Sequence, residues 1–167
     1  MGFTTHNLNP IEADITMRLY SSILGGGTDS LLFKTVREKL SLCYSIDSSY
    51  SHLSNLLSIR TAINNQNYDL TVAEIKKVIA AMSQGKFSVK LLNNCKKDFI
   101  NTLKAYDDSL FSLTSEYINR IFQNQKEIHE RIITIKTLTK EDVIKVSKKI
   151  NLDVIFFLET GDDNGKV

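Results

Sequence analysis

The chain has 167 residues, of which 42% are hydrophobic and 24% charged, a balance that suits one soluble domain spanning residues 1–167. Its 21 basic and 19 acidic residues almost cancel, to a net charge of +2, so charge gives no reason to expect nucleic acid or a membrane as partner. The few cysteines match no metal-ligand spacing, and no early stretch has the pattern of a signal peptide. We therefore expect a cytoplasmic protein.

The first predicted helix begins at Asn9-Pro10, where an amide side chain can cap the helix and proline takes the first helical position. Apolar residues then recur at every fourth position: Ile11, Ile15, Leu19 and Ile23. Gly25, Gly26 and Gly27 are predicted to end this helix in the left-handed conformation that glycine tolerates. A second helix follows, capped by Thr28 or Asp29, and its predicted buried residues are Leu32, Val36 and Leu40.

Two strands are predicted after the second helix. Side chains alternate in character over residues 44–50 and again over residues 57–63, which is the period of a half-buried strand. Residues 52–55 form a short polar connection between the two runs. This pattern predicts an antiparallel hairpin.

Three amphipathic helices are predicted next. The first carries an apolar stripe of Val72, Ile75, Ile79 and Met82. Ser88 caps the second, whose apolar positions include Leu92, Cys95, Phe99 and Leu103. The third starts at Asp108 or Ser109, and we expect it to bury a face made of Leu110, Leu113, Tyr117 and Ile121.

A fourth helix and a last strand close the chain. The helix starts at residues 139–142, whose acidic first turn favours the helix dipole, and its predicted buried residues are Val143, Val146 and Ile150. Residues 153–159 are predicted as the strand. This order indicates an α+β layered domain with a mainly antiparallel sheet packed on helices. Three strands are few for so many helices, so we expect the N-terminal part of the sheet to be truncated.

The run Gly25-Gly26-Gly27 allows two interpretations. A phosphate-binding loop should follow a strand and end in Lys-Ser or Lys-Thr. Here the glycines follow a predicted helix, and Thr28-Asp29 stands after them, with a carboxylate that would repel an anion. A break between two helices is therefore favoured, and binding of an anion or nucleotide is the weaker alternative.

The sequence contains no group of residues typical of a metal or nucleophilic site. His6, His52 and His129 are too far apart for zinc-ligand spacing, and no serine lies in a Gly-x-Ser-x-Gly motif. Cys43 and Cys95 fall at apolar positions, where buried thiols are usually inert. We expect no metal ligand and no catalytic residue within this chain.

Arg37 and Tyr44 lie seven residues apart across a predicted helix-to-strand turn. In a purely structural interpretation the arginine balances the helix dipole and the tyrosine belongs to a half-buried strand. In a functional interpretation both donate hydrogen bonds to one acceptor, such as a peptide carbonyl, since arginine offers planar donors and tyrosine a hydroxyl.

Four short motifs of this region resemble the C-terminal, non-catalytic domain of the M16 (pitrilysin/insulinase-type) zinc peptidases. They are Leu24-Gly25-Gly26-Gly27, Ser30-Leu31-Leu32-Phe33, Arg37-Glu38-Lys39 and, seven residues after the arginine, Tyr44. Residues 85–88, 139–150 and 152–158 are similar to a later turn and to the terminal helix and strand of these domains. The chain looks closest to the processing-peptidase-like proteins of Gram-positive bacteria.

This resemblance implies an α/β sandwich of the LuxS/MPP-like metallohydrolase fold, repeated in pairs. One copy holds zinc through His-x-x-Glu-His, and the other contributes an arginine and a tyrosine that contact the substrate backbone, by position Arg37 and Tyr44. His-x-x-Glu-His does not occur in this chain, and the first strand looks cut to residues 2–5. We therefore expect part of a longer protein that is inactive on its own.

Two functions follow from the resemblance. In the first, the chain is the substrate-clamping domain of an M16-type zinc endopeptidase acting on peptides, and zinc lies in the companion domain. In the second, it is a non-catalytic scaffold or peptide-binding subunit that pairs with another M16-like protein. The expected partners are the companion zinc domain or a homologous subunit, together with a peptide substrate.

Overall fold

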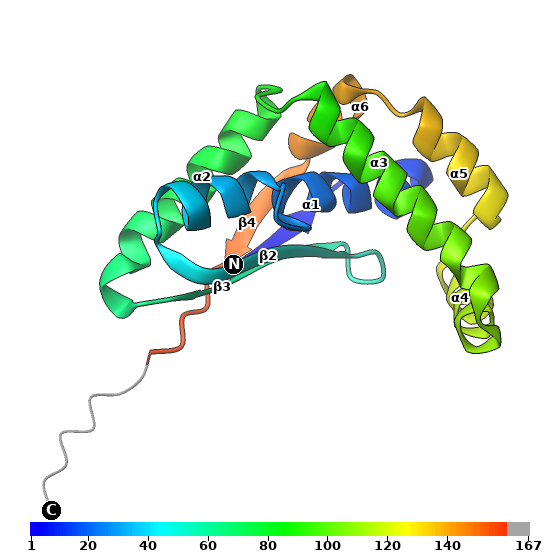
Figure 1. Ribbon diagram of the computed structural model, residues 1–167, viewed down its shortest axis with the longest axis horizontal. Coiled ribbons are helices and arrows are strands. Elements are labelled where there is room, and N and C mark those ends of the chain that lie inside the picture. The colour runs from blue at the N-terminus through cyan, green and yellow to red at the C-terminus, as the bar shows by residue number, and fades with distance from the viewer. Residues whose placement is uncertain (160–167) are drawn as a thin grey trace, which may run out of the picture.

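The computed structural model describes residues 1–159, apart from the side chains of residues 107, 108 and 123. At its centre is a four-stranded sheet in the order β2-β3-β1-β4, in which each neighbouring pair of strands is antiparallel. The helices gather on one side of this sheet (Figure 1). The predicted α+β class with a mainly antiparallel sheet is therefore confirmed.

The strands confirm the predicted hairpin and correct the predicted bounds of the last strand. They are β1 (Gly2–Thr5), β2 (Cys43–Ser51), β3 (Leu56–Ile63) and β4 (Ile150–Val154). The predicted hairpin is β2 and β3, whose ladder runs from Cys43 opposite Ile63 to Ser51 opposite Leu56. The last strand is not residues 153–159: it begins at Ile150, which the apolar spacing places in a helix, and ends at Val154. The reason is that β4 pairs with β1, and that ladder ends at Gly2 opposite Val154.

The first helical stretch starts where Asn9 predicts it. It consists of a π-helical turn, η1 (Glu12–Thr16), continued by α1 (Met17–Gly25). The Glu12 amide donates a hydrogen bond to Asn9 Oδ1 at 2.9 Å, and the Asn9 amide donates one to Glu12 Oε2 at 2.8 Å. This reciprocal arrangement satisfies two amides that a helix start otherwise leaves unpaired.

The second helix differs from the prediction at both ends. Its helical residues begin at Leu31 and continue as the π-helical η2 (Phe33–Lys39). Asp29 does not cap it but pairs with Lys34 at 2.7 Å. Leu32 and Val36 are buried as expected, whereas Leu40 is 38% exposed. The Leu40 amide donates a hydrogen bond to the Thr35 carbonyl, which closes a π-helical turn. A π-helical turn is wider than an α-helical one, so Leu40 does not point in the direction that an α-helical spacing predicts.

Between residues 65 and 147 the structure has a 3₁₀ turn η3 (Asn65–Asn67), a second one η4 (Ala105–Asp108) and five α-helices. The five are α2 (Tyr68–Ser83), α3 (Val89–Lys104), α4 (Leu110–Gln123), α5 (Ile128–Thr137) and α6 (Lys140–Ser147). Ser88 and Ser109 cap α3 and α4 as predicted. The separate helix α5 is not distinguished by the sequence pattern.

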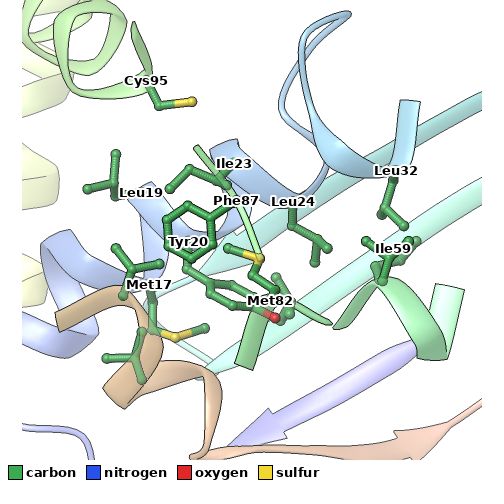
Figure 2. Close-up of a cluster of buried hydrophobic side chains, with 14 of the residues drawn as sticks. Met17, Leu19, Tyr20, Ile23, Leu24, Leu32, Ile59, Met82, Phe87 and Cys95 are labelled. Atoms are coloured by element: carbon green, nitrogen blue, oxygen red, sulfur yellow. The ribbon is translucent and has the colours of Figure 1, made fainter. Parts of the chain in front are cut away.

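The core is built around α1, which lies between the sheet and the outer helices (Figure 1). Five of its apolar side chains have no exposed surface: Met17, Leu19, Tyr20, Ile23 and Leu24. Figure 2 shows them gathered with Ile59 of β3, Met82 of α2 and Phe87 of the following loop. Because α1 is covered on every side, its position determines where the other layers can pack.

Helix α4 does not bury the face that its spacing predicts. Leu110, Leu113, Tyr117 and Ile121 are 85%, 41%, 56% and 61% exposed. Figure 1 shows why: α4 projects beyond the sheet and the other helices, past the end of α3. Within the described residues, this apolar face has no partner to pack against.

A buried ion network ties the outer helices to the first helical turn. The Arg131 guanidinium of α5 lies 3.0 Å from Glu116 of α4 and 3.4 Å from Asp14 of η1. All three residues are at most 6% exposed. Charges removed from water at this depth require partners, so the network constrains how α4 and α5 attach to the body of the domain.

A second ion pair links the start of the first helix to the end of α6. The Lys149 ammonium donates a hydrogen bond to Glu12 at 2.6 Å, and Lys145 lies 3.4 Å from the same carboxylate. Burial by itself raises the pKa of Glu12, but the hydrogen bonds from Lys149 and from the Asn9 amide outweigh it and leave the pKa below its ordinary value. Glu12 therefore stays ionised and paired at neutral pH.

Replacement of Arg131 by alanine tests the buried network. Arg131→Ala leaves two buried carboxylates without their shared cation, so we expect a loss of about 3–5 kcal/mol in the free energy of unfolding, measured by urea denaturation at neutral pH. Arg60→Ala is the control, because Arg60 forms an exposed pair with Asp47 and should cost less than about 1 kcal/mol. Equal losses for the two variants would show that burial of the network does not matter.

Candidate functional site

The connection between η2 and β2 carries both predicted contact residues and has a tightly bonded backbone. The amides of Ser41 and Leu42 donate to the carbonyls of Arg37 and Val36 at 3.2 and 3.0 Å, which closes the helix end. Ser41 takes the left-handed conformation with φ 51°, a geometry typical of such endings. The Asn67 side chain also donates to the Leu42 carbonyl at 3.3 Å. The turn is thereby held from its own helix and from η3.

Arg37 projects from the last turn of η2 and is exposed. Its guanidinium lies over the ring of Phe33, 4.5 Å from the ring centre. A planar cation resting on an aromatic face keeps its outer N–H groups available while its stem is held in place. Arg37 is therefore positioned as a hydrogen-bond donor facing solvent.

Tyr44 stands at the beginning of β2 and its side chain is 76% exposed, although the strand as a whole is half buried, as the structural interpretation expects. The register of β2 against β3 shifts between Cys43 and Ser45, which places Tyr44 at a bulge. A bulge turns a side chain away from the face that simple alternation assigns to it. The phenol thus leaves the same connection as Arg37, on an edge strand of the sheet.

The role of these two residues stays a prediction. Both are exposed, and they flank the connection between η2 and β2, but their side chains share no hydrogen bond within the described part of the chain. Among the described residues β2 is an edge strand of the sheet, and the outward backbone groups of an edge strand are able to pair with an extended segment.

The glycines end α1 as predicted, but for a different physical reason. Gly26 has φ −82°, and among the described glycines only Gly85 has a positive φ, so the expected left-handed ending is wrong. The constraint at Gly25 is space: a Cβ there would lie 2.7 Å from the Ser48 amide nitrogen of β2. At Gly26 a Cβ would meet Ser22, whereas at Gly27 it would meet nothing within 4 Å.

Ser21 and Ser48 hold α1 at this short distance from β2. The Ser48 hydroxyl donates to the Ser21 carbonyl at 2.6 Å, and the two hydroxyls lie 3.0 Å apart. Both residues are buried, so the small side chains satisfy each other's polar groups where a larger residue would separate the helix from the sheet. The glycine run is accordingly a packing device.

The space beside the glycines does not suit an anion. A shallow groove of about 420 Å³ is lined there by Gly26, Gly27, Asp29 and, from α3, Lys97 and Asp98. The hydrogen bond from Lys34 holds the pKa of Asp29 below its ordinary value, so this carboxylate is ionised at neutral pH. The lining holds two carboxylates and one ammonium, so it offers no excess positive charge to attract a phosphate, which argues against the nucleotide alternative.

The remaining candidates of the sequence are scattered. Among residues 1–159, the structure brings together no group of three or more histidine, cysteine, aspartate or glutamate residues that could hold a metal ion. Cys95 is buried, which raises the pKa of its thiol, and Cys43 is half buried. None of the described helices is both long and apolar enough to span a bilayer.

Comparison with protein families and curated proteins gives one consistent result. A family model described as "Peptidase M16 inactive domain" matches residues 1–99. The chain is 32% identical over 145 residues to the "Probable inactive metalloprotease YmfF" of Bacillus subtilis, covering 86% of this chain and 34% of that protein. It is 25% identical over 158 residues to an "Uncharacterized zinc protease" of Rickettsia bellii, covering 90% and 37%. The chain thus spans about a third of the length of these relatives.

Solved structures share the fold. A conserved protein from Enterococcus faecalis superposes with a TM-score of 0.88 at 25% identity, covering 98% of this chain and 39% of that one. The peptidase M16 inactive domain from Pseudomonas fluorescens superposes with a TM-score of 0.76 at 20% identity, covering 91% and 37%. The chain therefore shares its fold, an antiparallel sheet covered by helices, with these two structures.

Alanine substitutions at two of the glycines test the packing explanation. Gly25→Ala forces its Cβ against the β2 backbone, and we expect a loss of about 1–3 kcal/mol in the free energy of unfolding. Gly27→Ala is the matched control, since it meets open space at ordinary φ and should not destabilise the protein. If thermal or chemical unfolding gave the same result for both variants, the close approach of α1 to β2 would not be the reason for Gly25.

Proposed function

Since the chain belongs to the M16 peptidase family as an inactive domain, we propose that it is the substrate-clamping half of an M16-type zinc endopeptidase acting on peptides. The observation that carries this proposal is the pair of exposed donors, Arg37 and Tyr44, on one rigid connection beside the free edge of β2. Zinc and the water-activating glutamate would lie in a companion domain. The relatives are about three times as long as the matched region, so a protein of that length contains residues enough for such a domain.

The chemistry of the clamp follows from the two side chains. A guanidinium offers several N–H donors in a fixed plane, and a phenol offers one O–H, so together they can hold the carbonyl of an extended peptide. Donors of this kind also favour negative charge as it develops on a carbonyl oxygen during hydrolysis. In this chain the residues bind and orient the peptide, while the scissile bond would be broken by groups of the companion domain.

The clamp is tested in the full-length protein with a fluorogenic peptide. Arg37→Ala and Tyr44→Phe each remove one donor, and we expect kcat/KM to fall by about a hundredfold, the scale of losing one such hydrogen bond to the reacting carbonyl. Lys39→Ala is the control, because Lys39 is an exposed cation in the same helical turn and should leave kcat/KM unchanged. Full activity of both variants would refute the assigned role.

The second candidate function is that of a non-catalytic scaffold or peptide-binding subunit paired with another M16-like protein. The exposed apolar face of α4 favours pairing, because soluble proteins rarely leave such a surface uncovered. It includes Leu110, Phe111, Tyr117, Ile121 and Phe122, all more than half exposed. A relative named as an inactive metalloprotease is consistent with this role. If the full-length protein binds peptides but cleaves none, this second function holds.

Substitutions on α4 test the pairing surface. Phe111→Ser combined with Phe122→Ser removes two large exposed apolar side chains, and we expect the affinity for the companion M16-type domain to fall by at least about a hundredfold, since each phenylalanine buried in the interface contributes about 1.5–3 kcal/mol. Leu53→Ser, at a residue 73% exposed in the β2–β3 turn, should leave the affinity unchanged. Titration calorimetry with the separately produced companion domain measures both. Equal affinities for all variants would show that α4 lies outside the interface.

A further inference from the structure

β1 is shorter than the strand on one side of it. The β1–β3 ladder ends with Gly2 opposite Ser58 and two bonds of 2.8 Å between the backbones of Met1 and Ile59. On its other side, β3 remains paired with β2 as far as Ile63. Residues 60–63 of β3 therefore have a strand neighbour on one side only, within the part of the chain that the structure describes.

On the other side of β1, the chain that follows β4 also runs past the end of β1. The ladder with β4 ends at Val154, yet the following residues keep the exposure pattern of a strand. Ile155 and Phe157 are half buried, while Phe156 and Leu158 are 78% and 82% exposed. The centres of the Phe157 and Tyr68 rings lie 4.6 Å apart. Because Tyr68 belongs to α2, residues 155–158 stay close to the helical layer. The sequence pattern that predicts a strand over residues 153–159 is thus present without a pairing partner among the described residues.

Between these two segments lies a cleft of about 650 Å³. It is lined by Met1 and Gly2 at its closed end, by β3 and residues 154–158 along its sides, and by α2 residues Tyr68, Thr71, Val72 and Ile75. In Figure 1 the N-terminus lies at this place, beside β3 and the end of β4. Because β1 fills the space between β3 and β4, the cleft that prolongs it is one strand wide, about 10 Å between the flanking backbones.

The walls of the cleft offer unpaired polar groups. In an antiparallel ladder, alternate residues direct both backbone groups to the same side. The Ile59 backbone bonds to β1, so the backbones of Thr61 and Ile63 point to the same side, into the cleft. The hydroxyl of Thr71, a residue 1% exposed, also lines the cleft and has no partner among the described residues. Buried polar groups of this kind are normally satisfied.

We propose that this cleft holds one more extended segment, formed by the residues that precede Met1 in the longer protein, which prolongs β1 and pairs with both β3 and residues 155–158. The preceding residues are the favoured occupant because they are joined to β1. They therefore enter the cleft at the correct place and register, without the entropy cost of binding a separate partner. The match to this chain covers only 34% of the relative from Bacillus subtilis, so a protein of that length has residues available for the segment.

Two details of β1 agree with this occupant. Phe3 is 3% exposed and Met1 is half buried, so the odd-numbered positions of β1 face the helices. Because side chains of a strand alternate between its two faces, the second and fourth residues before Met1 would also face the helices and would be apolar. Burial also lowers the pKa of the Met1 amino group, which donates to the Ile59 carbonyl. A peptide N–H would form the same bond without removing a charge from water.

The proposal is tested by hydrogen exchange at the amides of Thr61 and Ile63. The chain is compared with a variant that carries Val-Thr-Val-Thr-Val-Thr before Met1, which places valines toward the helices. We expect exchange at both amides to slow about tenfold or more. A Gly-Ser-Gly-Ser-Gly-Ser extension is the length-matched control and should leave exchange unchanged, because it has little tendency to form a strand. Unchanged exchange in the valine variant would overturn the proposal.

Two further measurements identify the occupant. In the full-length protein, the amides of Thr61 and Ile63 should be as protected as in the valine variant. If they instead exchanged as fast as in the 167-residue chain, the assignment of the cleft to preceding residues would be overturned. The valine hexapeptide added separately should protect neither amide. Equal protection by the free peptide would instead make the cleft a site for a strand from another molecule.

Discussion

The close approach of α1 to β2 is the contact on which the rest of the structure depends. Gly25 brings the helix backbone so near the sheet that a single added carbon would lie 2.7 Å from a β2 nitrogen. Ser21 and Ser48 satisfy each other within this contact, so their hydroxyls are not left unpaired by it. At this distance α1 is enclosed by sheet and outer helices, and five of its side chains lose all contact with water.

Charged residues then locate the outer helices relative to this buried one. Glu12 reaches Lys149 beyond α6, and Asp14 reaches Arg131 of α5, so both connections start from η1, the turn that leads into α1. Apolar packing tolerates small shifts, but a buried ion pair requires a particular geometry. Through Glu116 the same network attaches α4 by one charged residue, while most of its apolar face remains uncovered.

The proposed clamp and the proposed strand site lie at the same end of the β2–β3 hairpin. Tyr44 follows Cys43, whose partner across the ladder is Ile63, the last residue of β3. Beyond Ile59 that part of β3 is paired on one side only, within the described residues. A strand in the cleft would pair its other side and so steady the end of the sheet that carries Tyr44. The companion part of the longer protein would then contribute to the peptide site through the sheet as well as through zinc.

Local patterns are sufficient to predict most elements. The hairpin, the caps at Asn9, Ser88 and Ser109, and the helix break at the glycines follow from interactions within a few residues, and the structure confirms each of them. The motifs leading to Arg37 and Tyr44 indicate the family through their resemblance to those of M16 domains. What these two residues contact is not encoded locally, because their exposure and the bulge at Tyr44 depend on how β2 pairs with β3.

The sequence by itself therefore determined most of the helices and strands and the fold class, because periodicity and capping act within one segment. The family was indicated by the resemblance of its motifs. Only the tertiary structure decided which apolar faces are covered, why Gly25 has no side chain, and where β4 stops. The last two depend on a partner distant in the sequence, Ser48 for Gly25 and β1 for β4, and the face of α4 is uncovered within the described residues. Periodicity shows that a surface is apolar, but only packing shows what lies against it.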